Sequence, residues 1–298
     1  MHLRFVDDRR TLVWAFVLFP LLPALAYARP ALLPWLVPAL LYASYCSGVL
    51  THNHLHCPLF VERRANVAYG AWLSLFYGVP TFTWIPTHNQ NHHRYLNGDG
   101  DATQTTRHSK TDTLFAALTY PLTSTRNQLP GIVRYVRGAR TRPARLRRIA
   151  LESLVLVLGH AGLLALAVAL HGGPLGALVY GVAVGAPAAL AGYFMMLTNY
   201  LQHVGCDPHS PDDHSRNFTS PAFNWFVFEN GLHTVHHEHA GVHWSRYRAL
   251  HDARAARIAP ALNASSLFGY VAHTYFVVPV ARALGYARAL VTRRSARG

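Results

Sequence analysis

The sequence has 298 residues, of which 51% are hydrophobic and only 13% are charged, and its formal net charge is +14. The charged share is about half that of an ordinary soluble domain, which argues against a soluble protein and for one membrane-embedded domain over residues 1–298. A basic chain can bind nucleic acid, but no nucleic-acid-binding motif accompanies the arginines, so we expect no such partner. In a membrane protein, arginines instead mark the cytoplasmic side. The excess of arginine over lysine is typical of a GC-rich bacterial genome and predicts a bacterial inner membrane.

Two apolar runs follow a short charged start. Residues 11–28 can cross about 27 Å of hydrocarbon as a helix, and residues 31–50 form a second run directly afterwards. The end of the first run also resembles a signal-peptide cleavage site, but the second run favours a helical hairpin. Both ends of this hairpin are predicted to be cytoplasmic by the positive-inside rule, because arginines flank it at Arg4, Arg9, Arg10, Arg63 and Arg64.

The first histidine group lies at the end of the second run. His52 and His56 are four residues apart and share a helix face, whereas His54 points about 200° away from His52 and is left out. Residues 67–85 are apolar again, but a crossing there would put this group and the next on opposite sides of about 30 Å of hydrocarbon. Side chains so far apart cannot share a metal. We therefore predict an interfacial or re-entrant segment.

The second histidine group contains His88, His92 and His93, at positions i, i+4 and i+5. A polar loop, residues 97–110, follows it. In this loop Asp99 and Asp101 either accept hydrogen bonds that orient nearby histidines or only shape the turn, and the sequence leaves both interpretations open.

A dense run of arginines extends from Arg126 to Arg148. Such a run is expected to face the anionic lipids of the cytoplasmic leaflet. The same charges also suit a docking face for an acidic redox partner.

Residues 149–170 and 174–198 form a second pair of apolar runs, joined by a short glycine-containing turn. Asn199 and His203 follow on the cytoplasmic side. They are four residues apart and can point back towards the other histidines.

The third histidine group contains His233, His236 and His237, at positions i, i+3 and i+4. The loop before it, residues 205–221, is rich in proline and aspartate, so its histidines, His209 and His214, are predicted to lie at the surface. After the group, Gly241 interrupts the helical period. We expect His239 and His243 to be structural or to orient ligands.

Residues 262–287 are moderately apolar, and arginines follow them at 288, 293, 294 and 297. This basic tail favours a cytoplasmic C-terminus. We therefore predict an interfacial helix here rather than a fifth span.

The three histidine groups predict a metal centre. Neutral imidazole suits iron, zinc, copper or nickel. Eight histidines are too many for one ion of ordinary coordination number, so the pattern indicates two metals.

The three groups, spelled HxxxH, HxxxHH and HxxHH, resemble in order and spacing the histidine boxes of the membrane fatty acid desaturase and hydroxylase superfamily. This resemblance implies an all-α integral membrane protein with two transmembrane helical hairpins. It also implies a cytoplasmic histidine-rich cap, residues 51–148 and 199–298, with interfacial helices. The four implied spans are about 11–28, 31–50, 149–170 and 174–198.

The resemblance also implies a non-haem di-iron centre with O2 as co-substrate. The pair Asn199 and His203 resembles an Asn-x-x-x-His motif of acyl-CoA desaturases, in which asparagine contacts the metal through water. The first box has three intervening residues rather than the four of delta-9 acyl-CoA enzymes, and no haem-binding HPGG segment is present. The electron donor is therefore expected to be a separate ferredoxin- or cytochrome b5-type protein with its reductase. The implied histidine ligands are His52, His56, His88, His92, His93, His203, His233, His236 and His237.

The sequence thus predicts a membrane oxidoreductase that desaturates a fatty acyl chain. Hydroxylation of an alkyl, acyl or carotenoid-like substrate is the close alternative, because the two outcomes differ by about an ångström in substrate position. A membrane metal transporter is the alternative of another class. Its polar ligands would be expected near the bilayer midplane, whereas these histidines lie just beyond the apolar runs.

Overall fold

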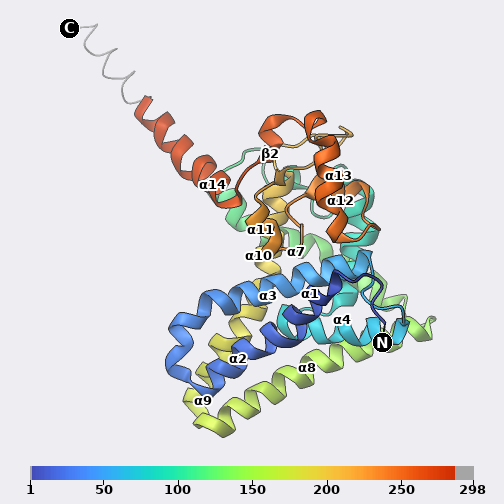
Figure 1. Cartoon of the computed structure of the whole chain (residues 1–298), viewed down its shortest axis with the longest axis vertical. Helices are drawn as coiled ribbons and strands as arrows, with labels where there is room; N and C mark the ends of the chain where they lie inside the picture. The colour runs from blue at the N-terminus through green and yellow to red at the C-terminus, as the bar shows by residue number, and fades with distance from the viewer. Residues whose placement is uncertain (1, 286–298) are drawn as a thin grey trace, which may run out of the picture.

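The computed structural model describes residues 2–285, and this part of the chain is mostly helical (Figure 1). Five of its helices are long and apolar enough to cross a membrane. Four of them contain the predicted spans and extend beyond them, so that the first histidine group and His203 lie on the same continuous helices as the spans. These four are Asp8–Ala28, Pro30–His56, Pro143–His171 and Gly173–His203.

The fifth apolar helix, Leu267–Gly285, falls where we predicted an interfacial helix. It begins as α14 (Leu267–Ala272), continues through the π-helical segment η9 (His273–Val277), and projects away from the rest of the molecule (Figure 1). Length and composition would let it cross a membrane, so the number of spans stays a prediction. The arginines at 288, 293, 294 and 297 lie outside the described residues.

Three of the four helices that contain the predicted spans are built from several helical segments. The first joins α1 (Asp8–Val13), η1 (Trp14–Leu18) and α2 (Phe19–Ala28), and the second joins η2 (Pro30–Leu32) and α3 (Leu33–His56). The third is α8 (Pro143–His171) alone. The fourth joins α9 (Gly173–Tyr180), η5 (Gly181–Gly185) and α10 (Ala186–His203).

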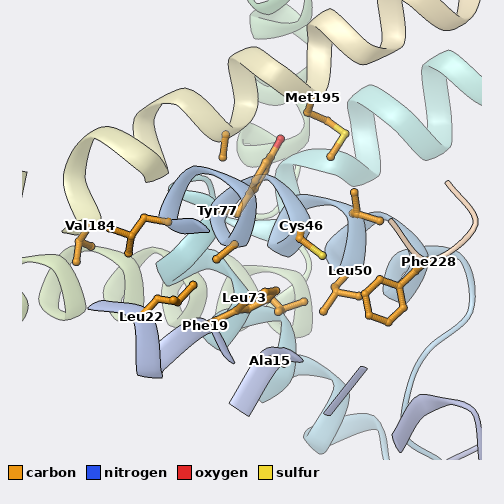
Figure 2. Packing of buried hydrophobic residues seen from close by; sticks show 14 of the residues in the cluster. Ala15, Phe19, Leu22, Cys46, Leu50, Leu73, Tyr77, Val184, Met195 and Phe228 are labelled. Carbon is orange, nitrogen blue, oxygen red and sulfur yellow. The ribbon is translucent and has the colours of Figure 1, made fainter. Parts of the chain in front are cut away.

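Helix α3 lies at the centre of the apolar core, where it packs against α2, α4 and α10. Figure 2 shows the core side chains between these helices, among them Phe19, Cys46, Leu73 and Met195. Cys46 is fully buried and packs as a small apolar residue. In contrast, α8 exposes leucine and valine side chains along its length, which is the pattern of a helix that faces lipid.

The segment between the first two histidine groups does not separate them. It forms α4 (Arg63–Tyr77), a helix of 15 residues that ends at Gly78 in the left-handed conformation (φ 75°). The chain then continues through η3 (Thr81–Thr83) into η4 (Ile85–His92) and α5 (His93–Tyr95). His52, His56, His88 and His93 lie together in the structure, as expected if residues 67–85 do not cross the membrane. The interfacial or re-entrant placement of this segment stays a prediction.

The remaining elements form a cap at the histidine end of the long helices (Figure 1). A short parallel pair of strands, β1 (Asn217–Phe218) with β2 (Asn263–Ala264), ties two distant parts of this cap together. The helices of the cap are α6 (Thr105–His108), α7 (Leu114–Arg137), α11 (Pro221–Phe226), α12 (His233–Glu238) and α13 (Tyr247–Arg254), with 3-10 turns η6 (Trp244–Arg246), η7 (Ala255–Arg257) and η8 (Pro260–Leu262).

Gly78→Ala is expected to destabilise the protein because the turn after α4 needs both a left-handed backbone and a missing side chain. A Cβ at this position would lie 2.5 Å from the Ala188 carbonyl oxygen of α10. We expect a loss of about 2–4 kcal/mol, from about 1 kcal/mol of backbone strain and an overpacked contact. The measurement is the melting temperature of the detergent-solubilised protein.

Gly205→Ala is the matched control. Gly205 also has a left-handed backbone (φ 72°), but nothing lies within 4 Å of its missing Cβ. This variant should lose only the part of the stability that comes from backbone strain. Equal losses in the two variants would contradict the close approach of the α4 turn to α10.

Candidate metal centre

Nine histidines converge into two groups, and they are the nine that the sequence singled out. Within each group, every histidine offers one ring nitrogen, and these nitrogens all lie within 4.8 Å of one another. They come from α3, from η4 with α5, from α10 and from α12. The first group is His52, His56, His88, His93 and His236, and the second is His92, His203, His233 and His237.

In the group of four histidines, three ring nitrogens face one another at the distances expected between ligands of one metal. The Nε2 atoms of His203 and His233 are 3.0 Å apart, and the Nε2 of His237 lies 3.2 Å from the first and 3.0 Å from the second. Three mutually close imidazole nitrogens cannot all be satisfied by hydrogen bonds, because each nitrogen either donates or accepts. Two nitrogens bound at a right angle to one metal at about 2.1 Å would be about 3.0 Å apart. The donor set therefore fits a metal ion.

The first group has the same spacing. His236 Nε2 lies 2.9 Å from His52 Nε2 and 3.0 Å from His93 Nε2, which in turn lies 3.0 Å from His88 Nε2. The Nε2 atom of His56 is buried and has no hydrogen-bond partner among residues 2–285. A buried nitrogen without a partner is unfavourable unless something else binds it, and a metal is what the surrounding donors suit.

Burial favours the neutral form of five of these histidines. It lowers the pKa of His88, His93, His233, His236 and His237 well below the usual value, and the neighbouring imidazoles lower it further. A neutral imidazole has a free lone pair. The groups are therefore ready to bind a metal at neutral pH.

Among His88, His92 and His93, the first two lie on a π-helical segment, η4, and His93 follows directly as its C-cap residue. An α-helix would turn His93 about 140° away from His88, since each residue advances about 100°. Hydrogen bonds from residue i to i+5 instead bring residue i+5 back towards residue i. This winding lets His88 and His93 join one group while His92, between them, joins the other.

The helix that carries His233, His236 and His237, α12, is positioned by the strand β1. The Asn217 side chain accepts a hydrogen bond from the Thr234 backbone N–H (3.0 Å) and donates to the Thr234 hydroxyl (3.0 Å), which fixes the first turn of α12. Just before this helix, Phe228 and Glu229 both have positive φ, of 48° and 58°. Two such residues in succession are strained, and strain of this kind is typical of functional sites.

Several ligand histidines are oriented through their outer ring nitrogen. His236 Nδ1 lies 3.1 Å from the Tyr247 hydroxyl, and His203 Nδ1 lies 3.2 Å from the His214 carbonyl oxygen. Each contact leaves the other nitrogen, Nε2, facing its group. Partners of this kind fix the tautomer and the ring plane of a ligand.

Asp101 makes the most complete of these contacts. Its buried carboxylate lies 2.8 Å from His92 Nδ1 and accepts hydrogen bonds from the Asn97 N–H, the Thr103 N–H and the Thr103 hydroxyl, each at 2.7 Å. Burial alone would raise the pKa of Asp101, but His92 and these hydrogen bonds hold it below the usual value. His92 Nε2 is buried without a hydrogen-bond partner among the described residues, and it is the nitrogen that lies towards the other three histidines of its group.

The comparison with known families agrees with this geometry. A family model described as fatty acid desaturase matches residues 29–267, a range that contains all nine converging histidines. The chain belongs to the fatty acid desaturase family. No match was found among curated proteins or among solved structures. Family membership makes this desaturase-family protein an oxidoreductase, and its five apolar helices agree with a membrane protein.

In this desaturase-family protein, the structure distinguishes the roles of Asp99 and Asp101, which the sequence left open. Asp101 orients His92, whereas Asp99 is exposed and, among residues 2–285, accepts a hydrogen bond only from Gln104 (3.3 Å). The side-chain N–H of Asn199 donates to the Tyr120 hydroxyl (2.9 Å). Its contact with metal through water stays a prediction.

The histidines outside the two groups mostly lie as expected. His54 lies with Nε2 3.1 Å from the Asn66 carbonyl oxygen and anchors the start of α4. His209 and His239 are exposed, and His243 is buried against Asp8, with its Nε2 3.2 Å from the carboxylate. His214 does not lie where the sequence predicted.

The prediction that His214 lies at the surface is wrong. The residue is only 3% exposed, because the loop folds inwards so that its carbonyl can meet His203. Sequence reasoning also missed Tyr247, which contacts His236. Neither residue shares a helix with the ligand it contacts, so no local spacing could have shown the contact.

Asp101→Asn is expected to weaken metal retention by about 10- to 100-fold, because the amide cannot accept four hydrogen bonds and hold His92 in one tautomer. Metal content after dialysis against a chelator measures this. Asp99→Asn is the matched control, since it removes the same charge from the same loop without touching a histidine. Equal metal loss in both variants would show that loop charge matters and that orientation of His92 does not.

Proposed function

We propose that the two histidine groups hold two iron ions and that the protein desaturates a fatty acyl chain with O2. The observation that carries the proposal is the convergence of nine imidazoles into two adjacent groups in a chain of this family. In the overall reaction, one CH2–CH2 pair and one O2, with two electrons and two protons from a donor, become an alkene and two waters. When bound, the iron ions supply electrons to O2 so that hydrogen leaves an unactivated C–H bond.

The proposed ligands are the nine histidines, with Asn199 acting through water. His52, His56, His88, His93 and His236 would hold one ion, and His92, His203, His233 and His237 the other. These nitrogen donors suit iron, and they come from segments that the core and the cap hold in place.

A small cavity beside the two groups is the proposed entry for the reacting carbons. It has a volume of about 120 Å³ and is lined by His88 and His92 as well as by Asn199, Trp84 and Met196. Such a volume admits only a few methylene groups, so the rest of an acyl chain must lie beyond it. Asn199 is fixed at this wall by Tyr120, whose hydroxyl donates to the Thr103 carbonyl oxygen (2.6 Å).

The proposed electron donor is a ferredoxin- or cytochrome b5-type protein with its reductase. At the end of α7 and in the turn before α8, the arginine run exposes Arg134, Arg137, Arg140 and Arg142 to solvent. An acidic donor would be steered to such a face, and the steering would weaken with salt.

We further propose that residues 1–298 form one domain in a bacterial inner membrane, with both termini and the metal centre cytoplasmic. The helical ends that carry His56 and His203 are flanked by arginines, as the positive-inside rule requires. The histidine groups lie at these ends rather than midway along the apolar helices, which disfavours a metal transporter.

The test is expression of the full chain with a reducing system, followed by metal analysis and mass spectrometry of the lipids. We expect two irons per chain and a product that has lost two hydrogen atoms. His236→Ala should abolish this product while the protein remains in the membrane, because His236 approaches both His52 and His93. His209→Ala, at an exposed histidine, should leave activity unchanged.

Other outcomes assign other functions. A gain of one oxygen atom without loss of hydrogen would replace desaturation by hydroxylation. One tightly bound zinc without O2 consumption would overturn the oxygenase proposal altogether. Full turnover by His236→Ala would remove this residue from the ligands.

Arg140→Glu is expected to slow reduction by an acidic donor by about 3- to 10-fold at low ionic strength, with the difference lost at high salt. Stopped-flow reduction at several salt concentrations measures this. Arg29→Glu, an exposed charge reversal at the opposite end of α2 and α3, is the control. Equal slowing in both variants would contradict docking between α7 and α8.

A further inference from the structure

A second cavity, of about 750 Å³, lies among the N-terminal segment, the end of α3 and the beginnings of α4 and α8. In Figure 1 the N-terminal end of the chain lies beside α4 and α8. Five arginines line this cavity and none of its lining residues is acidic. We call it the arginine pocket, and its arginines are Arg4, Arg63, Arg64, Arg147 and Arg148.

Two of the five arginines make hydrogen bonds within the protein. Arg148 Nε donates to the buried carboxylate of Glu152 (2.7 Å), and Arg4 Nε donates to a backbone carbonyl oxygen (3.0 Å). Glu62, the acidic residue next to α4, binds the backbone N–H of His2 (3.0 Å) at the N-terminus. The carboxylates around the pocket are therefore already engaged.

The other three arginines have no protein partner. Within residues 2–285, no carboxylate lies at ion-pair distance from Arg63, Arg64 or Arg147, and their guanidinium groups make no hydrogen bond. Like charges gathered around one cavity repel one another unless an anion compensates them. The pocket thus has an excess of positive charge and unused hydrogen-bond donors directed at an anion of the phosphate type.

The helices at the pocket carry charges of the wrong sign for their own dipoles. Arg63 and Arg64 occupy the first turn of α4, and Arg147 and Arg148 follow in the second turn of α8. Neither helix has an acidic residue in its first turn or a side-chain cap at its N-terminus. Helix N-termini favour negative charge, so Arg63 and Arg64 at the beginning of α4 make an anion beside them favourable.

An apolar stripe leads away from the pocket along α8. Leu151 lines the pocket, and Leu154 and Leu158 continue on the same helix face at i+3 and i+7. These three leucines are 42%, 56% and 59% exposed. An anionic head at the arginines with an apolar chain along this stripe is the arrangement of a phospholipid, not of a free phosphate.

We propose that the arginine pocket binds the phosphate headgroup of an anionic phospholipid, with an acyl chain along the outer face of α8. The proposal depends on membrane placement and is independent of the reaction at the metal centre. Arg63, Arg64 and Arg147 bind the phosphate, and the N-termini of α4 and α8 add their dipoles.

This lipid is not the substrate. The arginine pocket and the cavity beside His88 and His92 share no lining residue. His54 faces the pocket from α3 and His52 faces the metal groups, so α3 separates the two sites. The lipid would instead hold the beginnings of α4 and α8 against α3, where His54 meets Asn66.

The test is lipid binding to the purified full chain in detergent, measured as an apparent Kd by native mass spectrometry. We expect phosphatidylglycerol to bind saturably and phosphatidylcholine to bind at least about 10-fold more weakly. The triple variant Arg63→Gln/Arg64→Gln/Arg147→Gln should weaken phosphatidylglycerol binding by about 10- to 100-fold. If that variant is not recovered, Arg147→Gln alone should give a smaller loss of the same kind.

Arg134→Gln/Arg137→Gln/Arg140→Gln is the matched control, because it removes the same charge from exposed positions outside the pocket. Equal weakening in both triple variants would overturn a specific site. Competition by inorganic phosphate, or equal affinity for short-chain and long-chain phosphatidylglycerol, would show a free-anion site and overturn the lipid. Normal lipid binding with lost reduction by the donor protein would assign the pocket to that protein instead.

Discussion

Nine imidazoles brought together in a largely buried volume are the constraint on which the rest of the structure depends. Their nitrogens approach one another to 2.9–3.2 Å without enough hydrogens to satisfy every contact. Burying such groups is unfavourable unless they bind a metal. Metal binding and the folding of the cap are therefore expected to be coupled, because the ligands come from segments far apart in the sequence.

The apolar core and the metal centre depend on the same helix. α3 places Cys46 and Leu50 in the core. Further along the same helix it places His52 and His56 in the group of five converging histidines. A change in how α3 packs against α4 or α10 would move the histidines as well. The core thus orients the ligands directly, and the outer contacts of Asp101 and Tyr247 complete their orientation.

The sequence predicts much of this site because histidine is rare in apolar runs and its spacing is local. All nine converging histidines and four apolar helices were predicted from spacing, composition and the family resemblance. The division into two groups was not predictable, since an α-helical period cannot place His88 and His93 together and His92 apart. The π-helical winding that does so has no simple residue signature. The contacts of His214 and Tyr247 join segments that local spacing does not relate.

The distribution of arginine shows a similar limit. The positive-inside rule treats Arg126 to Arg148 as one run and predicts only the side of the membrane. In the structure the run divides, because the beginning of α8 places Arg147 and Arg148 at the arginine pocket, while Arg134, Arg137 and Arg140 lie outside it. Arginines in the first set face a cavity that also borders apolar, lipid-facing side chains, and those in the second set face water. Equal charges in one stretch of sequence therefore meet two different environments, and only packing decides which of them can hold a lipid and which can meet a soluble protein.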